Sequence, residues 1–232
     1  MVTAMVNQSA DMVVCKYTGI KSEGILKRRN DEKGYPLIEA GTYNRGDILR
    51  ALADNVVNQS VWNKLYKREL WNDIRYPEGR VYEDRCTSFR IMNLCNKVYA
   101  VNDVLYLHRV RPGSITDTYS QKNISDWLHS FLLFNIFIES QIPEIFDNSH
   151  LQNSQLSQLY VMINGYCRIC DSTKQYRKNL RKQIIDLERK VGFEALNGRM
   201  KRQYFFIRYC PYIATEYSKM LFLKRYIKDR LR

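Results

Sequence analysis

The sequence lacks any run of 18 apolar residues, and its first ten residues hold no basic stretch followed by an apolar one. No membrane-spanning helix and no secretory leader are therefore expected, and the cytoplasm is the default location. Internal repeats and low-complexity tracts are also lacking. Of the 232 residues, 45% are hydrophobic and 26% are charged, a composition that favours a folded core over global disorder. This length suits one domain with an extension, or two small domains.

The cysteines lack the spacing of a metal site. Among the six, only Cys167 and Cys170 form a C-x-x-C, and no second pair of Cys or His lies at ligand spacing. A pair of buried small residues on a helix is the commoner reading of such spacing, and a zinc or redox pair is the alternative.

Negative charge is scarce relative to positive charge. There are 37 Lys and Arg against 24 Asp and Glu, which gives a net charge of +13 at pH 7. This balance implies an anionic partner: a nucleic acid, an acidic membrane surface or a phosphorylated substrate. The 17 tyrosines suit contact with sugars, phosphates or a protein interface, but they suit a core equally well.

The first half of the chain reads as mixed α/β. Apolar runs rich in β-branched and aromatic residues predict strands, and apolar residues at helical spacing predict helices. Strands are expected at 11–18, 62–67, 97–103 and 104–110. A helix over 48–55 capped by Gly46-Asp47, a helical turn at 68–73, a chain turn at 76–79 and a helix beginning at Glu83 are also expected. Residues 20–45 read as a loop or loose hairpin.

From about residue 122 the apolar spacing becomes helical throughout. Four helical segments are predicted, at 125–140, 151–170, 177–196 and 200–210. The breaks fall at Pro143, Asp171-Ser172, Gly192, Gly198 and Pro211. The predicted organisation is therefore an α/β part at 1–117 and a helical extension at 118–232.

Two adjacent carboxylates, Glu83 and Asp84, lie where an extended basic segment runs into a helix. A carboxylate in the first turn of a helix lies near unpaired backbone N–H groups and the positive end of the helix dipole, which keep it ionised. An ionised carboxylate can accept the proton of an attacking hydroxyl. The alternative is the ordinary preference of acidic residues for first turns.

Three sequence blocks carry a resemblance to a known family. They are NKLYKR at 63–68, IRYPEGRVYED at 74–84 and LYLHRVRPGSI at 105–115. Together they resemble the inverting GT-A glycosyltransferases of family 2 that build capsular and other surface polysaccharides, over about residues 10–115. The resemblance implies a partial GT-A sheet followed by a helical C-terminal extension. It also implies a single-displacement sugar transfer with inversion, with Asp84 as the base toward the acceptor hydroxyl and Glu83 supporting it.

The same resemblance suggests roles for six further residues. Arg109 and Arg111 would face the donor diphosphate, since guanidinium pairs well with phosphate oxygens, and Ser114 would lie in a loop over the active site. His108 stands where some relatives have a metal-ligating histidine and others an aromatic residue. Lys64 and Lys67 could contact the acceptor or the diphosphate. A solvated strand face explains the lysines and both arginines as well.

The resemblance also predicts a missing part. Such enzymes bind a nucleotide-sugar donor in a preceding half that ends in D-x-D, whose carboxylates hold Mn²⁺ or Mg²⁺ against the leaving diphosphate. The sequence has no D-x-D. The expectation is that the donor half is absent or supplied by a separate chain, that the parallel strands flanking Met12–Cys15 are absent, and that an open apolar face results. The chain beginning at Met1 would then be a truncated gene product, one with a mis-assigned start, or one part of a split enzyme.

The C-terminal stretch MLFLKRYIKDRLR at 220–232 has five Lys and Arg against one Asp. With FFIRY at 205–209 it could form a helix on anionic lipid at the inner face of the plasma membrane, close to a glycan or lipid-linked acceptor, or simply a solvated helix. Two other classes stay open: a non-catalytic accessory protein, and a nucleic-acid-binding protein. The second is disfavoured because the charge is spread along the chain and no RNA-binding motif or zinc finger is found.

Overall fold

The computed structural model describes residues 1–21, 38–110, 119–141, 143–145, 148–169 and 172–216. The chain forms two compact units. The first comprises Met1–Ser114 and Leu132–Leu151, and the second comprises Ile115–Phe131 and Gln152–Arg232. Within the described ranges, no helix has the length and apolar character needed to cross a membrane.

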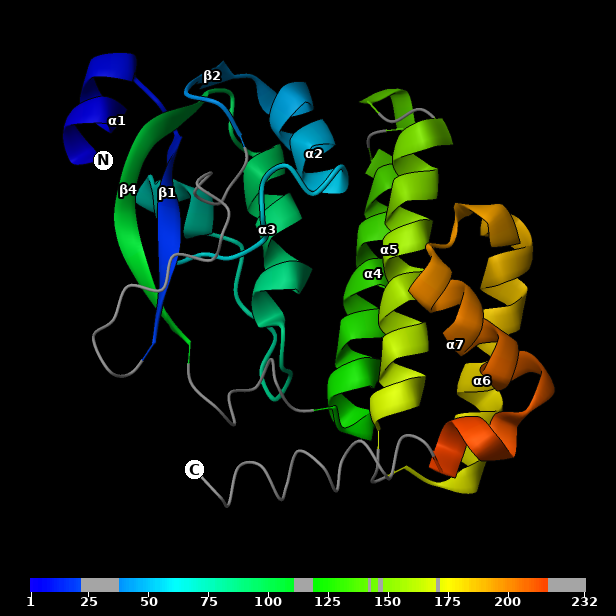
Figure 1. The fold of residues 1–232 in the computed structure, drawn as a ribbon. Helices are drawn as coiled ribbons and strands as arrows, with labels where there is room; N and C mark the ends of the chain where they lie inside the picture. The colour runs from blue at the N-terminus through cyan, green and yellow to red at the C-terminus, as the bar shows by residue number, and fades with distance from the viewer. Residues whose placement is uncertain (22–37, 111–118, 142, 146–147, 170–171, 217–232) are drawn as a thin grey trace. The chain divides into compact units, whose positions relative to one another are not determined.

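The first unit is built on a mixed four-stranded sheet with the order β2-β4-β1-β3 (Figure 1). Its strands are β1 (Met12–Lys21), β2 (Gly41–Tyr43), β3 (Lys64–Tyr66) and β4 (Val98–Val110). β1 runs parallel to β4, whereas β3 and β2 pair antiparallel at the two edges. The predicted strands at 11–18 and 62–67 are thus confirmed, and β2 was missed because it is only three residues long.

The start of β1 is the centre of this sheet. Met12, Val13 and Val14 are fully buried and lie between β4 on one side and β3 on the other. The expectation that Met12–Cys15 lack parallel flanking strands is wrong on the side of β4, which runs parallel to β1, whereas the strand on the other side is antiparallel. This short antiparallel strand comes from the NKLY block, and no feature of a three-residue strand predicts its register against β1.

The two strands expected at 97–103 and 104–110 are one continuous strand, β4. Val14 pairs with Ala100 and Lys16 with Val104, so the register with β1 shifts over this stretch. The polar pair at 102–103 lies inside the irregularity. A polar interruption that predicts two strands is here accommodated by a local irregularity within one strand.

Three α-helices accompany the sheet within Met1–Ser114: α1 (Val2–Gln8), α2 (Arg45–Ala53) and α3 (Glu83–Asn93). α2 begins three residues earlier than predicted, because Asn44 and not Gly46-Asp47 is its cap. The Asn44 side chain accepts a 3.0 Å hydrogen bond from the backbone N–H of Asp47. The predicted turn at 68–73 is the 3-10 helix η1 (Arg68–Trp71).

The core of the first unit joins the sheet to its helices. Ile48 and Leu49 of α2, Ile91 and Met92 of α3, and Met12 of β1 are all essentially inaccessible to solvent. Burying a large aliphatic side chain contributes roughly 1.5–3 kcal/mol. This core therefore anchors α3, whose first turn carries the two predicted carboxylates.

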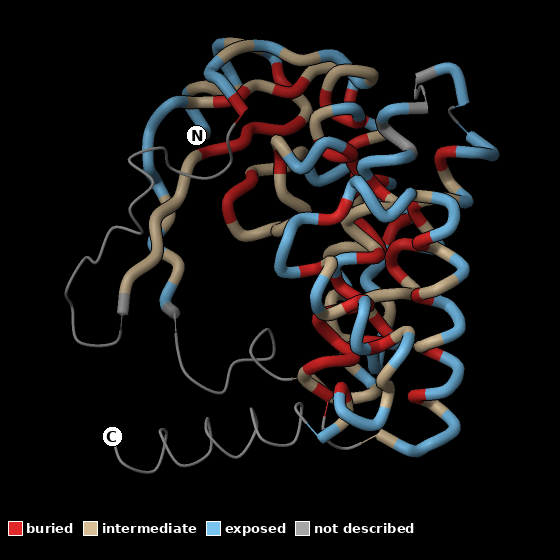
Figure 2. The backbone as a smooth tube through the Cα atoms, turned by 45° about the vertical axis from the view of Figure 1, so that its right-hand side comes forward, coloured by how far each residue is buried: buried red, intermediate tan, exposed pale blue. Residues whose placement is uncertain are grey.

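The predicted helices after residue 122 are confirmed as α4 (Gln121–Gln141), α5 (Asn148–Arg168), α6 (Lys174–Val191) and α7 (Gly198–Tyr209). Short 3-10 helices, η3 (Pro143–Ile145) and η4 (Phe193–Ala195), fill two of the breaks. Gly192, with φ of 88°, ends α6 in a left-handed conformation that favours glycine. Buried and exposed positions alternate along these helices, as amphipathic spacing requires (Figure 2).

In the second unit, α6 and α7 are joined by polar side chains. Arg181 of α6 donates hydrogen bonds of 2.7 and 2.5 Å to the carbonyl oxygens of Ile207 and Arg208, at the end of α7. The Tyr204 hydroxyl donates a 2.6 Å hydrogen bond to the buried Glu188 carboxylate. The two Arg181 bonds satisfy carbonyl groups at the end of α7 that would otherwise lack an intrahelical partner.

Cys167 lies in the buried face of α5. Burial raises the pKa of its thiol to about 11, which is typical of an inert structural cysteine. Cys170, the other half of the C-x-x-C, falls outside the described residues.

Candidate active site around Asp84

Glu83 and Asp84 are the first two residues of α3, as predicted. The Asp84 Oδ1 atom accepts a 2.8 Å hydrogen bond from the backbone N–H of Arg85. Tyr82, which precedes them, has φ of 61° and ψ of 37°, a left-handed conformation that is uncommon for a bulky residue. Strained backbone of this kind persists where the surrounding structure holds it, and it fixes the direction in which the following residues leave the turn.

The pKa of the Asp84 carboxyl is raised above 3.8, chiefly by burial and further by the neighbouring Glu83 carboxylate. The Arg85 N–H bond and the positive charges of Arg85 and Lys64 oppose this rise. Burial in turn lowers the pKa of the Arg85 guanidinium to about 10. A carboxylate with a raised pKa is a stronger base than a free one, which suits proton abstraction.

Two tyrosines that the sequence analysis did not single out lie near these carboxylates. Burial, with smaller contributions from the charges of Asp84 and Glu83, raises the pKa of Tyr76 to about 12. The rings of Tyr66 and Tyr76 lie 5.5 and 5.2 Å from that of Trp71, so the three form an aromatic row. Both tyrosines fall inside the blocks that carry the family resemblance, which is the signal that could have pointed to them.

Lys64 points into the protein. Its ammonium lies within 2.5–3.0 Å of four oxygen atoms, contributed by Asn58, Ser60 and Asn63. Burial lowers the pKa of Lys64 to about 7, against the opposing effect of the Asp84 charge. Lys64 therefore holds the loop before β3 in place. Its ammonium interacts electrostatically with the Asp84 carboxylate.

Lys67 is engaged in a structural ion pair. Its Nζ atom lies 2.7 Å from Oδ1 of Asp11. A ligand contact by Lys67 stays a prediction. The ion pair ties the segment after β3 to the residue before β1.

His108 lies in an aromatic cluster on the C-terminal half of β4. The Trp62 ring stacks on Tyr106 at 4.5 Å and on His108 at 5.1 Å, and the edge of Tyr17 meets Trp62 at 4.5 Å. Arg109, the next residue, is exposed.

Metal binding by His108 stays a prediction. Among the residues that the structure describes, no group of three or more His, Cys, Asp or Glu is arranged to hold a metal ion. Arg111 and Ser114, which were predicted to contact the donor or cover the site, lie outside the described residues.

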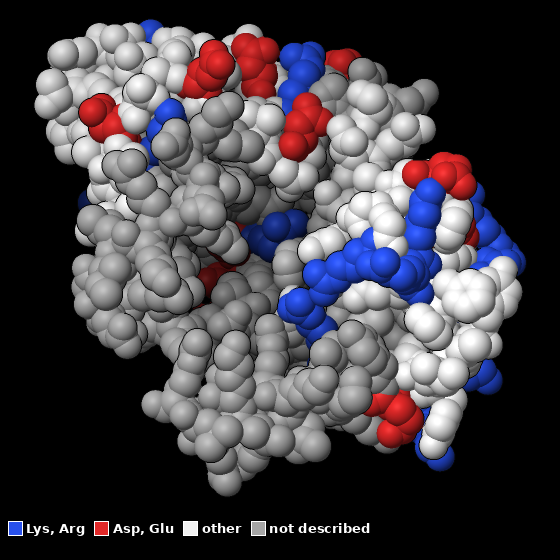
Figure 3. Space-filling view, viewed as in Figure 1, with Lys and Arg blue, Asp and Glu red and all other residues white. Residues whose placement is uncertain are grey.

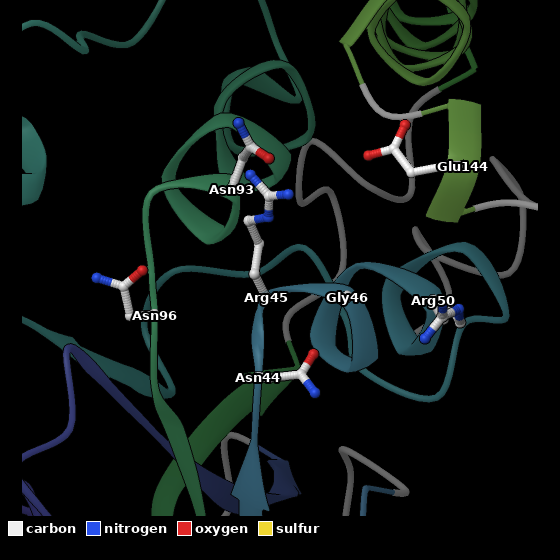
Figure 4. A pocket seen from close by; sticks show the side chains of 7 residues that line it. All are labelled: Asn44, Arg45, Gly46, Arg50, Asn93, Asn96 and Glu144. Carbon is white, nitrogen blue, oxygen red and sulfur yellow. The ribbon is translucent and has the colours of Figure 1, made fainter.

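A pocket of about 520 Å³ opens at the other end of α3 (Figure 4). Its lining is mostly polar and comprises Asn44, Arg45, Gly46, Arg50, Asn93, Asn96 and Glu144. Asn93 is nine residues along α3 from Asp84, or about 14 Å at the helical rise of ~1.5 Å per residue. None of the predicted site residues lines this pocket, so it is separate from the carboxylates.

No family model matches the chain. It is similar to two proteins of Streptococcus pneumoniae serotype 4 (strain ATCC BAA-334 / TIGR4). It is 44% identical over 55 residues to the glycosyltransferase GlyG, and 33% identical over 73 residues to the glycosyltransferase GlyA. These stretches cover 24% and 32% of this chain, and 18% and 10% of the two relatives. The chain therefore matches only a small part of each longer protein, and the likeness supports a relationship to glycosyltransferases.

Proposed function

We propose that this chain carries the acceptor side of a glycosyltransferase site, with Asp84 as the general base. The observation that supports this most directly is the Asp84 carboxylate itself. It is half-buried at the N-terminus of α3, it has a raised pKa, and it is flanked by a second carboxylate and two tyrosines. The likeness to proteins named glycosyltransferases supports the reaction class.

The proposed reaction is a single displacement with inversion, as in GT-A enzymes of family 2 that build surface polysaccharides. The acceptor hydroxyl attacks the anomeric carbon of a nucleotide-sugar. A new C–O bond forms, the bond from that carbon to the diphosphate oxygen breaks, and the nucleoside diphosphate leaves with the electron pair. The hydroxyl proton passes to Asp84. Such a base contributes typically ~10²–10⁴-fold to the rate.

The neighbours of Asp84 have supporting roles in this proposal. Glu83 keeps the local potential negative and so maintains the basicity of Asp84. The Arg85 N–H bond fixes the direction of the carboxylate. Tyr76 is 37% exposed and carries a hydroxyl able to contact an acceptor sugar. The described residues gather no set of metal ligands, so the proposal assigns no metal to them.

The test is a transfer assay with the full chain in an assembly that contains a donor-binding half, with a panel of uridine and guanosine diphosphate hexoses as donors and p-nitrophenyl hexosides as acceptors. We expect nucleoside diphosphate release and a product of inverted anomeric configuration. Asp84→Asn should reduce the rate by ~10²–10⁴-fold. Asp47→Asn is the matched control, since Asp47 is also a first-turn aspartate, on α2, and it lies outside the proposed site.

Loss of activity in both variants would show that the effect is not specific to Asp84. Full activity of Asp84→Asn would overturn the proposal, and so would the absence of transfer in an assembly that pairs the unaltered chain with a donor-binding half.

A further inference from the structure

A row of large apolar side chains is exposed on the second unit. Phe205, Phe206 and Tyr209 of α7 are 51%, 41% and 63% accessible, and Tyr212 and Ile213 just beyond it are 77% and 53% accessible. The Phe205 ring lies 5.1 Å from that of Tyr209 and 5.8 Å from that of Phe206. The three rings of α7 are therefore one continuous patch. Together with the exposed side chains of Tyr212 and Ile213, which follow in the chain, we call it the aromatic ridge.

The ridge lies on the side of α7 that faces away from its core. Met200, Tyr204 and Ile207 are buried and lie on one side of the helix. At ~100° per residue, Phe205 and Tyr209 project from the opposite side. The core of the second unit is therefore complete without the ridge, and the ridge is not needed for its packing.

Positive charge surrounds the ridge. Arg199 and Arg202 are exposed. At ~100° per residue, Arg202 lies about 60° around α7 from Phe205 and Arg199 about 20° from Phe206, so both arginines are next to ring-bearing positions. α7 contains no Asp or Glu, and residues 172–216 hold eleven Lys and Arg against four Asp and Glu. In the view of Figure 3, Lys and Arg gather over the helices of the second unit, beside uncharged surface.

We propose that the aromatic ridge docks on an anionic lipid surface. Aromatic and aliphatic side chains insert at the boundary between headgroups and acyl chains, and arginines beside them reach lipid phosphates. Apolar side chains beside a strip of basic ones on the same helix face match this arrangement. The docking is independent of the chemistry proposed at Asp84.

A nucleic acid is the main competing occupant for a basic and aromatic surface. The ridge favours lipid for two reasons. Its rings contact one another edge-on or tilted, with planes 83° and 47° apart, so they do not offer parallel platforms for successive bases. Ile213 adds an aliphatic group, which suits acyl chains and has no flat face for stacking.

The test is vesicle sedimentation of the full chain with phosphatidylcholine alone and with phosphatidylcholine containing phosphatidylglycerol. We expect binding to the anionic vesicles that weakens with salt. Phe205→Ser with Tyr209→Ser should weaken it at least about tenfold, through lost apolar insertion. Arg199→Gln with Arg202→Gln should weaken it about fivefold per charge at low salt.

Matched controls come from the first unit. Leu105→Ser with Leu107→Ser removes two leucines that are 54% and 56% exposed on β4. Arg68→Gln with Arg90→Gln removes two exposed charges. Both control pairs should bind vesicles like the unaltered chain. The melting temperature of every variant should stay unchanged, because all the altered side chains are exposed to solvent.

Three results would overturn the proposal. The first is equal binding to neutral and anionic vesicles. The second is full binding by the Phe205→Ser, Tyr209→Ser variant, which would place lipid contact elsewhere in the chain. The third is that the unaltered chain binds a single-stranded 30-nucleotide probe and the Phe205→Ser, Tyr209→Ser variant does not, while neither of the two binds vesicles. That result would make the ridge a nucleic-acid surface.

Discussion

Lys67 Nζ lies 2.7 Å from Asp11 Oδ1, although the two residues are 56 positions apart in the chain. The other Asp11 oxygen, Oδ2, accepts hydrogen bonds of 2.8 and 3.0 Å from the backbone N–H groups of Asn96 and Lys97. One carboxylate thus joins the segment before β1, the segment after β3 and the turn before β4. The packing of the sheet where β1 and β4 begin and β3 ends depends on this residue.

Asp11→Ala should therefore destabilise the first unit. Hydrogen bonds to a charged group contribute about 1.5–3 kcal/mol each, and the loss also strands the two backbone N–H groups. We expect the free energy of unfolding to fall by about 2–4 kcal/mol in urea titrations at pH 7. Asp47→Ala, which removes an exposed pair with Arg50, should cost under about 1 kcal/mol. Equal losses in the two variants would contradict a joining role for Asp11.

The contribution of Asp11 should also depend on pH. Burial alone would raise its pKa, but the hydrogen bonds from Lys67, Lys97 and Asn96 outweigh that effect and hold the pKa below 3.8. A depressed folded-state pKa means that the stabilisation is present above the unfolded value, near 3.8, and is lost as the pH falls through the folded one. The stability difference between the unaltered chain and Asp11→Asn should shrink as the pH falls from 5 toward 2, and a constant difference over that range would contradict the assignment.

Asp84 should show the opposite sign. Its folded-state pKa is raised, so the folded chain holds a proton that the unfolded chain releases at about pH 3.8. Stability therefore declines as the pH rises from 3.8 to the folded pKa and is level above it. Asp84→Asn removes the buried charge and keeps an oxygen for the Arg85 N–H. We expect this variant to be at least as stable as the unaltered chain at pH 7, with the difference vanishing below pH 3.8.

That result would separate a catalytic role from a structural one. Replacing a catalytic residue lowers the activity and leaves the free energy of unfolding unchanged or higher, which is a common trade-off at active sites. Urea titrations at pH 7 and pH 3.5 supply the measurement. A drop of more than about 1 kcal/mol for Asp84→Asn at pH 7 would instead mark Asp84 as part of the folding framework.

Gly165 should be sensitive to the addition of one methyl group. A Cβ atom placed on Gly165 of α5 would lie 2.8 Å from Cδ1 and 3.1 Å from Cγ1 of Ile124, a buried residue of α4. Alanine gains about 1 kcal/mol over glycine in a helix, whereas overpacking costs typically about 1–3 kcal/mol. We expect Gly165→Ala to be destabilising in the unaltered chain.

The same substitution should become stabilising beside Ile124→Val, because valine lacks the Cδ1 atom. A double-mutant cycle of thermal unfolding measures this coupling. If Gly165→Ala has the same effect with either partner, close approach at this point does not limit the packing of α4 on α5.

The sequence predicts helices α2 to α7 and most of the strands, because their apolar spacing is strong and uninterrupted. Helix α1 (Val2–Gln8) is not predicted; none of its residues is buried, so it has no core-facing side to mark it. α3 is predicted from its first residue, since acidic residues open it and apolar ones follow at helical spacing. The position of β3 beside β1 is not predicted, because pairing between distant segments depends on tertiary packing and leaves no local signal in a three-residue strand. The continuity of β4 is missed for a similar reason, since a polar pair within a strand resembles a turn.

The candidate site is predicted in part. Glu83 and Asp84 lie where the first-turn argument places them. Lys64 and Lys67 were taken as surface residues able to meet a ligand, whereas one is buried against loop oxygens and the other pairs with Asp11. Distinguishing a ligand-binding lysine from one that holds a loop requires its partners in space. Tyr66 and Tyr76 were missed because tyrosine is abundant in this chain and its spacing alone does not mark a site.

Arg181 spans from α6 to the last carbonyl oxygens of α7, and this affects how the end of α7 opens. Amide hydrogen exchange near Phe206 and Cys210 requires local opening of that last turn. Because the Arg181 guanidinium holds the carbonyl groups of Ile207 and Arg208 in place, the opening must also release a side chain of α6. The slowest-exchanging amides at the end of α7 should therefore report on the two helices as one cooperative unit.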